Sequence, residues 1–369
     1  MDLTEYVQRQ KHVVAQQSRA VRDFTVFDYN YIPEKPFIRS ESKQIIDAML
    51  RFDVSGIATN FAVIGSRGSG KTLTMKYLAR VVPAQTDLSM RYVNCRHHNT
   101  SFKILARLLN KRCTGLSLDK LFEMFSESIT GKTVFVLDEV DLMSAKDKNR
   151  DILYLLSRSE KPVMVIMLSN NPHLLRELDA ASKSSLQLVQ MHFANYNAEQ
   201  INAILLERAQ KGLVSYDYTE VSEIAAMTTK KTNSDTRVAI KTLYYNVTEP
   251  QKSVESCFEN ARKDIVIDVI NDLSDQNLLI LTAAAQNKSD LTKNIYDLYC
   301  RLCRSQCEKP FSYVYYYSNL GYLQSIGLIA LVSTKFGRTY TNRVVLTFNH
   351  SILFDTCRLR FSRVPAPRS

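Results

Sequence analysis

The residues with the clearest chemical pattern lie between positions 65 and 72. They match the pattern G-x-x-x-x-G-K-[ST] at every fixed position, in the order Gly65, Ser66, Arg67, Gly68, Ser69, Gly70, Lys71 and Thr72. Glycines let backbone N–H groups approach a phosphate closely, and the N-terminus of a following helix favours negative charge. In this pattern the lysine reaches the β- and γ-phosphates and the hydroxyl ligates Mg²⁺. The segment therefore predicts a phosphate-binding loop for ATP or ADP.

Two carboxylates, an amide and an arginine could complete this site. Asp138 and Glu139 end an apolar run. Asp138 suits Mg²⁺, directly or through water, and Glu139 suits a general base that orients a water for attack on the γ-phosphate. Asn170 follows another apolar run and could hold that water, although Asn-Asn-Pro is also a common turn. Arg237 opens a later helical segment and could reach the γ-phosphate.

Short apolar segments alternate with helical patterns in the first half of the chain. The predicted strands are Phe61–Gly65, Arg91–Cys95, Thr133–Asp138, Val163–Asn170 and Gln187–Phe193. This alternation predicts an α/β fold with a parallel sheet covered by helices on both faces. From Asn197 to about Asp272 the apolar residues recur only at helical spacing, which predicts a small helical domain. A third segment begins near Leu273.

Composition restricts the class of protein. The chain has 369 residues, 48 Lys and Arg against 37 Asp and Glu, and seven cysteines. No apolar run reaches the ~18–20 residues of a membrane helix, and the N-terminus has no secretion-signal pattern. We therefore expect no membrane partner and a cytoplasmic protein with reduced thiols. Of the net charge of +11, +8 lies between Lys293 and Ser369. This excess favours a polyanionic partner, although a solvated basic face is the alternative.

The C-terminal segment has the pattern of a DNA-binding domain. Helices are predicted at Leu278–Ala285, Leu291–Cys303 and Phe311–Ile326, followed by a hairpin at Leu328–Phe348. This order is that of a winged helix. In the third helix, five residues are expected in the core, namely Tyr313, Tyr316, Tyr317, Leu320 and Leu323. The predicted DNA contacts are Ser312, Tyr315 and Asn319 on this helix, and Lys335, Phe336, Gly337, Arg338, Tyr340 and Arg343 in the hairpin.

A second basic surface is predicted after the second strand. Lys103, Arg107, Lys111 and Arg112 lie on one side of an amphipathic segment and could form a second DNA-binding surface. A solvated helix is the alternative interpretation. Three cysteines, Cys300, Cys303 and Cys307, have spacing that metal sites also use. That spacing is equally one stripe of a helix, and we favour buried thiols over zinc.

The motifs, taken in order, resemble those of the AAA+ ATPases, and within them the archaeal origin-recognition and cell-division-control initiators. The resemblance covers roughly residues 28–348. It rests on Tyr31-Ile32-Pro33 through Arg39, Asp138 through Asp141, Ser169-Asn170, Leu178-Asp179, Lys183 through Leu186, Tyr196 through Gln200, and Ser234 through Arg237.

This resemblance implies an AAA+ nucleotide-binding base with an N-terminal extension at residues 1–195, a helical lid at 196–272 and a winged-helix domain at 273–369. It implies that Tyr31, Ile32, Pro33, Arg39, Tyr196 and Arg237 contribute to nucleotide binding. It also implies recognition of double-stranded origin DNA, with paralogous initiator subunits and the replicative helicase as further partners.

One departure from the family bears on catalysis. The initiators usually carry Pro-Arg after the Leu-Asp pair, and the arginine acts on a neighbour's nucleotide. This chain has Ala180 and Ala181 there. Losing such an arginine can remove a factor of about 10³–10⁵ in rate, so we expect slow turnover or none. Alternative interpretations are a P-loop signalling ATPase with a winged helix, whose lid should carry Gly-x-Pro, and a transposition-helper ATPase, which usually lacks the wing.

Overall fold

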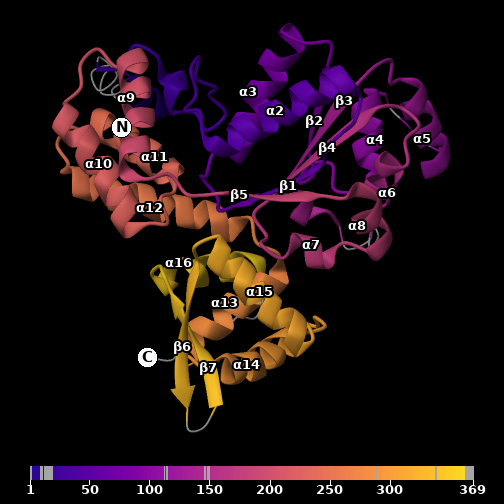
Figure 1. Ribbon diagram of the computed structural model, residues 1–369. Helices are drawn as coiled ribbons and strands as arrows, with labels where there is room; N and C mark the ends of the chain where they lie inside the picture. The colour runs from indigo at the N-terminus through magenta and orange to yellow at the C-terminus, as the bar shows by residue number, and fades with distance from the viewer. Residues whose placement is uncertain are drawn as a thin grey trace. The chain divides into compact units, whose positions relative to one another are not determined.

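The chain forms two compact units in a computed structural model (Figure 1). One comprises Asn30–Asn195, and the other comprises Met1–Tyr29 together with Tyr196–Ser369. The structure describes residues 2–8, 11, 20–111, 113, 115–144, 147, 150–287, 289–336 and 339–361. Within the part of the chain that the structure describes, the N-terminal segment up to Tyr29 therefore groups with the second half of the chain.

A parallel five-stranded sheet forms the centre of the unit Asn30–Asn195. Its strands are β1 (Phe61–Gly65), β2 (Ser89–Asn94), β3 (Thr133–Asp138), β4 (Val163–Ser169) and β5 (Val189–Phe193), within two residues of the predicted ranges. Their order in space is β2-β3-β4-β1-β5. Every residue of β1 and β3 is buried, as expected for strands covered on both faces.

Alternate residues of these strands point to opposite faces, and each face has its own apolar core. Val134 and Val136 of β3 pack with Ile45 and Met75 beneath α2 (Ser40–Ser55) and α3 (Lys71–Val81). Phe135 and Leu137 belong to the other core. That core is covered by α4 (Ser101–Leu109), α5 (Leu118–Glu127), α6 (Asp151–Ser157), α7 (Leu174–Glu177) and α8 (Ala180–Leu186). The predicted α/β sheet is thus confirmed.

Four helices of the second unit form the predicted helical domain. They are α9 (Ala198–Gly212), α10 (Tyr218–Lys231), α11 (Thr236–Thr248) and α12 (Val254–Asn271). A short N-terminal segment, η2 (Phe24–Phe27), packs against α9, and the N–H of Arg22 donates to the carbonyl of Gly212 at 2.7 Å. A Cβ at Gly212 would lie 2.3 Å from a methyl of Val26. This close approach explains why residues 20–28 belong with the helices.

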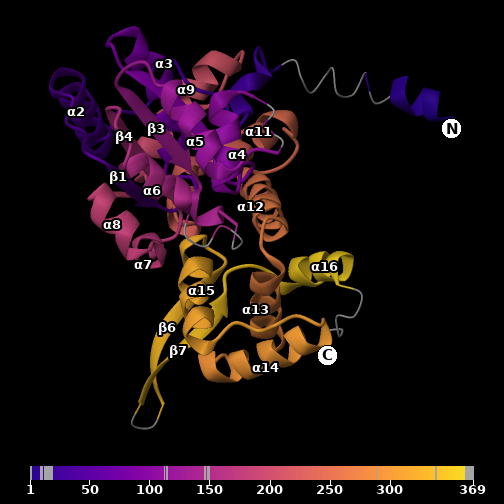
Figure 2. The same ribbon diagram turned by 90° about the vertical axis from the view of Figure 1, so that its right-hand side faces the viewer.

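The C-terminal part of that unit is a winged helix. It contains α13 (Asp275–Gln286), α14 (Thr292–Ser305), α15 (Tyr313–Ser325), and the antiparallel hairpin β6 (Ile329–Phe336) and β7 (Thr339–Leu346). The hairpin extends away from the three helices in Figures 1 and 2. A further helix, α16 (His350–Arg360), packs on α12 and α13 and was not predicted.

Part of the prediction for α15 was wrong. Tyr316, Leu320 and Leu323 are fully buried, as predicted. Tyr313 and Tyr317 are 42% and 41% exposed, although both were assigned to the core. They lie at the edges of the buried stripe, where the Tyr313 ring touches Tyr296 edge-on and the Tyr317 hydroxyl accepts a hydrogen bond from Asn342 at 2.6 Å. Each therefore covers the domain with part of its ring only.

Candidate nucleotide site and DNA-binding surfaces

The phosphate-binding loop connects the end of β1 to the start of α3. Gly68 and Gly70 have φ values of 76° and 86°, a region that suits glycine. Gly65 is required for a different reason, since a Cβ there would lie 2.6 Å from the carbonyl oxygen of Phe193 on β5. The glycines thus permit a narrow loop against the sheet. The loop is followed by the N-terminus of the 11-residue helix α3, whose backbone N–H groups and dipole would stabilise a bound phosphate.

Lys71 lies buried among oxygen atoms of the loop and of the neighbouring strand. Its Nζ donates to the carbonyls of Gly65 at 2.7 Å and Ser66 at 2.9 Å, and to Oδ1 of Asn170 at 3.1 Å. The structure therefore brings Asn170, at the end of β4, to the phosphate-binding lysine. The sequence predicted Asn170 at a strand end next to the Asp138 strand, without this contact to Lys71, and the role of Asn170 in holding water stays a prediction.

Thr72 and Asp138 are in direct contact. The Thr72 hydroxyl donates to Oδ2 of Asp138 at 2.8 Å, and the hydroxyl of Tyr92 donates to the same oxygen at 2.6 Å. Burial and the nearby Asp138 charge raise the pKa of Tyr92, so its phenol remains a donor. Hydroxyl and carboxylate oxygens are ligands that Mg²⁺ accepts. Together with the narrow glycine cradle, these residues fit a magnesium nucleotide, and a bound Mg²⁺ would neutralise phosphate charge there.

Glu139 occupies a strained position beside this pair. Its φ is 54°, in the left-handed region that costs energy for a non-glycine residue. Burial raises the pKa of its carboxyl, and a hydrogen bond of 3.1 Å from the Asn94 amide to Oε2 opposes this shift. Asn94 was not predicted as a site residue. It ends β2 and pairs with Asp138 across the parallel sheet, so its relation to Glu139 depends on strand order.

A second unpredicted residue, Asp141, lies behind Asn170. Its Oδ1 accepts from the Ser169 hydroxyl at 2.7 Å and from the Asn170 N–H at 3.3 Å. Burial raises the pKa of this carboxyl, and these hydrogen bonds and the Lys71 charge partly offset that effect. The carboxyl therefore orients the end of β4. The sequence signal was present, because Asp141 belongs to the acidic motif that begins at Asp138.

Arg39 is buried and contacts the phosphate-binding loop. Its NH1 donates to the carbonyl of Ser69 at 2.7 Å, its NH2 donates to the carbonyl of Ala194, and its guanidinium lies over the Phe193 ring. These contacts indicate that Arg39 holds the phosphate-binding loop in place. Near it in sequence, Tyr31 and Ile32 are half-buried and Pro33 is buried. Their predicted nucleotide contact stays a prediction. The Ser66 hydroxyl donates to Asn195, and Arg67 is half-buried in the same loop.

Tyr196 and Arg237 belong to the other unit. Tyr196 is 5% exposed and packs in the core of α9–α11. Arg237 lies in the first turn of α11, where the Asp235 carboxylate accepts from its backbone N–H at 3.0 Å and from its Nε at 2.9 Å. Their predicted roles at the nucleotide stay predictions. Ala180 and Ala181, at the start of α8 in the first unit, are exposed.

The predicted DNA-contacting residues of the wing domain lie on α15 and the hairpin. Ser312 caps α15, Tyr315 is 49% exposed, and the Asn319 amide donates to the Tyr315 carbonyl at 2.8 Å. Lys335 is exposed near the end of β6, whereas Arg343 forms an ion pair of 2.8 Å with Asp290. Gly337 and Arg338 lie outside the described residues, as do the side chains of Phe336 and Tyr340.

The second basic surface lies on α4. Ile104 and Leu105 are buried beneath it, and Lys103, Arg107 and Lys111 are exposed. The helix begins at Ser101, with the Thr100 hydroxyl accepting from the Lys103 N–H, and ends before Asn110, which adopts a left-handed conformation. Arg112 lies outside the described residues. The amphipathic segment thus forms a short helix with basic side chains outward.

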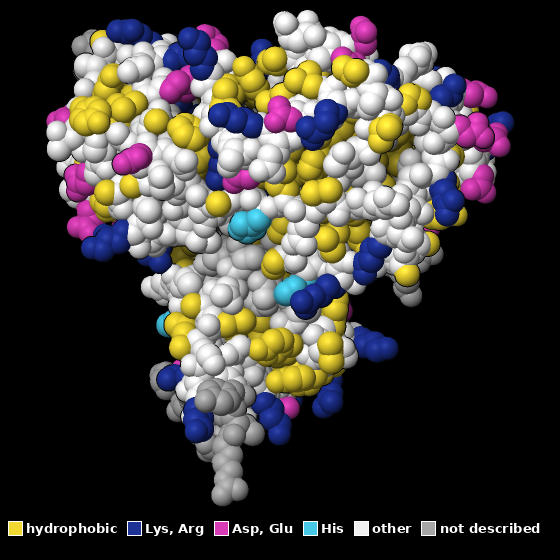
Figure 3. All heavy atoms as spheres, viewed as in Figure 1, with side chains coloured by type: hydrophobic (Ala, Val, Ile, Leu, Met, Phe, Trp, Pro, Cys, Tyr) yellow, Lys and Arg dark blue, Asp and Glu magenta, His cyan; other side chains and the backbone are white. Residues whose placement is uncertain are grey.

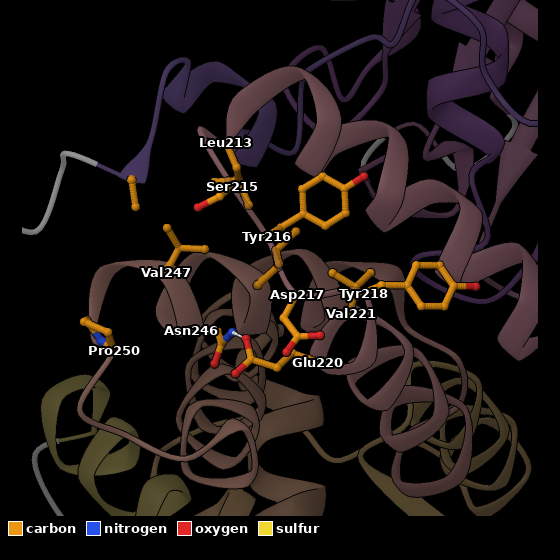
Figure 4. Close-up of a pocket in the computed structure, with 12 residues that line it drawn as sticks. Leu213, Ser215, Tyr216, Asp217, Tyr218, Glu220, Val221, Asn246, Val247 and Pro250 are labelled. Carbon is orange, nitrogen blue, oxygen red and sulfur yellow. Dashed lines mark hydrogen bonds between the residues drawn. The ribbon is translucent and has the colours of Figure 1, made fainter.

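Among the described residues, no group of three or more His, Cys, Asp or Glu could hold a metal ion, and no helix is long and apolar enough to cross a membrane. A hollow of about 560 Å³ lies in the helical domain (Figure 4). Tyr216, Tyr218 and Val247 contribute apolar surface to it, and Glu220 accepts from the Asn246 amide at 2.7 Å. None of the predicted site residues lines this hollow.

Comparison with known proteins indicates the relatives of this chain. A family model described as AAA domain matches residues 57–178. An ORC1-type DNA replication protein of Thermoplasma volcanium is 27% identical over 360 residues, covering 87% of this chain and 88% of the relative. ORC1-type DNA replication protein 1 of Sulfolobus acidocaldarius is 28% identical over 308 residues, covering 74% and 76%.

Solved structures agree in fold. The Aeropyrum pernix ORC1 protein, solved in complex with DNA, matches with a TM-score of 0.67 at 22% identity, covering 94% of this chain and 98% of the other. The Aeropyrum pernix ORC2 protein, solved in ADPNP–ADP complexes, matches with a TM-score of 0.63 at 19% identity, covering 93% and 100%. The chain is thus similar in sequence to ORC1-type DNA replication proteins over most of its length, and similar in fold to the Aeropyrum pernix ORC1 and ORC2 proteins.

Proposed function

We propose that this chain is an ATP- or ADP-binding replication initiator that recognises double-stranded origin DNA. One observation carries the proposal: the same chain contains a phosphate-binding loop and a winged helix. Lys71 and Thr72 of the loop contact Asn170 and Asp138 at neighbouring strand ends, and the winged helix has an exposed basic hairpin residue, Lys335. The DNA in the Aeropyrum pernix ORC1 structure and the nucleotides in the ORC2 structure support both halves of the proposal.

The residues of the loop have distinct roles in this function. Lys71 binds the β- and γ-phosphates, and exchanges its present contacts with the Gly65 and Ser66 carbonyls for phosphate oxygens. Thr72 and Asp138 would hold Mg²⁺, which would supply positive charge at the phosphates, and Glu139 would orient a water. We also propose that Arg237 and Tyr196, which belong to the helical domain, contribute to nucleotide binding. The bound nucleotide thereby sets the conformation in which the chain binds DNA.

We propose that ATP turnover is slow. Ala181 occupies the position at which the initiators usually carry the arginine that acts on a neighbour's nucleotide. A methyl group cannot neutralise the charge that develops on the transferred phosphoryl group. Nucleotide identity therefore acts mainly as a switch. Paralogous initiator subunits and the replicative helicase are the further partners that we propose. We also propose that the chain is associated with the nucleoid.

Nucleotide and DNA binding by the full chain test the proposal. Lys71→Ala should weaken binding of a fluorescent ATP or ADP analogue at least about tenfold, since hydrogen bonds to charged groups contribute about 1.5–3 kcal/mol. Lys43→Ala is the matched control, because Lys43 is an exposed lysine of α2. A random-sequence duplex should bind with an affinity that falls steeply with salt. Unchanged nucleotide affinity in Lys71→Ala, or no duplex binding at low salt, would overturn the proposal.

A further inference from the structure

Helix α15 exposes an uncharged, largely apolar surface where a DNA-reading helix is expected. Its sequence contains neither Lys and Arg nor Asp and Glu. In its first turns Val314 is 81% exposed and Tyr315 49%, with Tyr313 and Tyr317 beside them at 42% and 41%. Figure 3 shows hydrophobic side chains gathered on one face of the C-terminal domain, with Lys and Arg side chains around its margin.

The stability of the helix does not explain why a valine occupies the exposed position 314. At an exposed helix position, Ala, Lys or Glu stabilises more than valine, whose branched side chain loses rotamer freedom. A lone exposed apolar residue needs no explanation, but a contiguous apolar patch indicates a contact surface.

The neighbouring tyrosines are held in place by the rest of the domain. The Tyr315 ring packs edge-on against Phe311 at 4.6 Å between centroids, and the Tyr313 ring against Tyr296 at 5.0 Å. Asn342 of β7 donates to the Tyr317 hydroxyl at 2.6 Å. Val314 therefore projects from a surface whose surrounding rings are fixed by contacts on several elements.

The side chains of α15 match the major-groove edge of some base pairs better than that of others. In the major groove, guanine is usually read by Arg or Lys, cytosine by Asp or Glu, and the thymine methyl by an apolar side chain. The helix has none of the charged readers, and the Asn319 amide, which could read adenine, donates to the Tyr315 carbonyl of its own turn. The thymine methyl is thus the base-edge group that best matches its first turns.

Positive charge for phosphate binding comes from elsewhere in the same domain. Exposed basic residues on α14, the loop after it and β6 are Lys293, Arg301, Arg304, Lys309 and Lys335. In this arrangement the basic residues supply affinity for the DNA phosphates, whereas α15 recognises the bases, because phosphate contacts carry no sequence information. A positively charged margin around an uncharged reading surface complements duplex DNA.

We propose that Val314, with the exposed tyrosines beside it, reads thymine C5-methyl groups in the major groove, so that the winged helix selects A·T base pairs by apolar contact. The proposal rests on the proposed function, since it requires duplex binding by this domain. It assigns the specificity to a side chain that forms no hydrogen bond with a base.

Replacing thymine by deoxyuridine tests this reading, because it removes the methyl and keeps every hydrogen-bonding group. A duplex is first selected with the full-length chain from a random pool, and is then synthesised with thymine or with deoxyuridine throughout. Burial of one methyl corresponds to roughly fourfold in affinity. We therefore expect the deoxyuridine duplex to bind at least about fourfold more weakly.

Val314→Ala shortens the side chain and favours the helix, so the fold should be retained. We expect it to lose affinity for the thymine duplex and to bind both duplexes nearly equally. Leu359→Ala is the matched control, because Leu359 is an aliphatic residue of the same domain, 89% exposed on α16. It should keep the full difference between the two duplexes.

Two outcomes would overturn the inference and leave the proposed function standing: equal affinity of the unaltered chain for the two duplexes, or an unchanged difference in Val314→Ala. The inference would also be overturned if the chain bound duplexes but enriched no sequence from the random pool. Absence of duplex binding at low salt would instead contradict the proposed function.

Discussion

The ammonium of Lys71 donates a hydrogen bond of 3.1 Å to Oδ1 of Asn170, and so joins the start of α3 to the end of β4. The two residues are 99 positions apart in the chain. Because the lysine of this loop pattern reaches the β- and γ-phosphates, we expect Asn170 to lie close to the γ-phosphate of a bound ATP.

Asn170→Ala should therefore weaken ATP binding more than ADP binding. We expect a loss of about tenfold for ATP, the magnitude of one hydrogen bond to a charged group, and a change within about twofold for ADP. Titration calorimetry with each nucleotide measures both values. An equal loss for ATP and ADP would show that Asn170 acts only by holding Lys71.

Gly65→Ala should destabilise the nucleotide-binding unit by about 2 kcal/mol or more, because overpacking against a fixed neighbour costs about 1–3 kcal/mol. The added Cβ would lie 2.6 Å from the Phe193 carbonyl oxygen, which is held in the sheet by the pairing of β1 with β5. Gly131→Ala is the matched control, because a Cβ added at Gly131 would meet no atom within 4 Å. Urea unfolding of both variants checks this, and equal midpoints would contradict it.

Asp141→Asn should change how stability depends on pH. Burial raises the pKa of Asp141 above the unfolded value of about 4, so the unaltered protein loses stability as pH rises from that value through the folded pKa. The asparagine variant carries no such charge. Its stability relative to the unaltered protein should therefore increase across this interval and level off above it. Urea unfolding at several pH values measures the difference, and a difference independent of pH would refute the expectation.

Lys335→Ala and Arg343→Ala should differ in their effects on DNA binding. Lys335 is exposed near the end of β6, and removing a phosphate contact should reduce the slope of log affinity against log salt by about 1. Arg343 would have to give up its 2.8 Å ion pair with the Asp290 carboxylate to contact a phosphate, so we expect its removal to change the slope by less than 1. That ion pair is half-exposed and should contribute no more than about 1 kcal/mol to stability. Anisotropy titrations at several salt concentrations distinguish the two variants, and equal slopes would contradict this assignment.

The sequence alone was sufficient wherever the signal is local. The glycine-rich loop, the Asp138–Glu139 pair and the five strands depend on residue types at short spacing, and the structure places them within two residues of the predicted ranges. The winged helix was also predicted from the order of its helices and hairpin.

Only the tertiary structure decided which distant residues meet. Asn94 reaches Glu139 because β2 lies beside β3, and Arg39 reaches Ser69 and Ala194 because the loop and the end of β5 are neighbours. Periodicity assigns a residue to a face, but the order of strands in a sheet depends on how the helical connections cross. The exposure of Tyr313 and Tyr317 and the packing of residues 20–28 against α9 likewise follow from which surfaces are covered, and no local pattern records that.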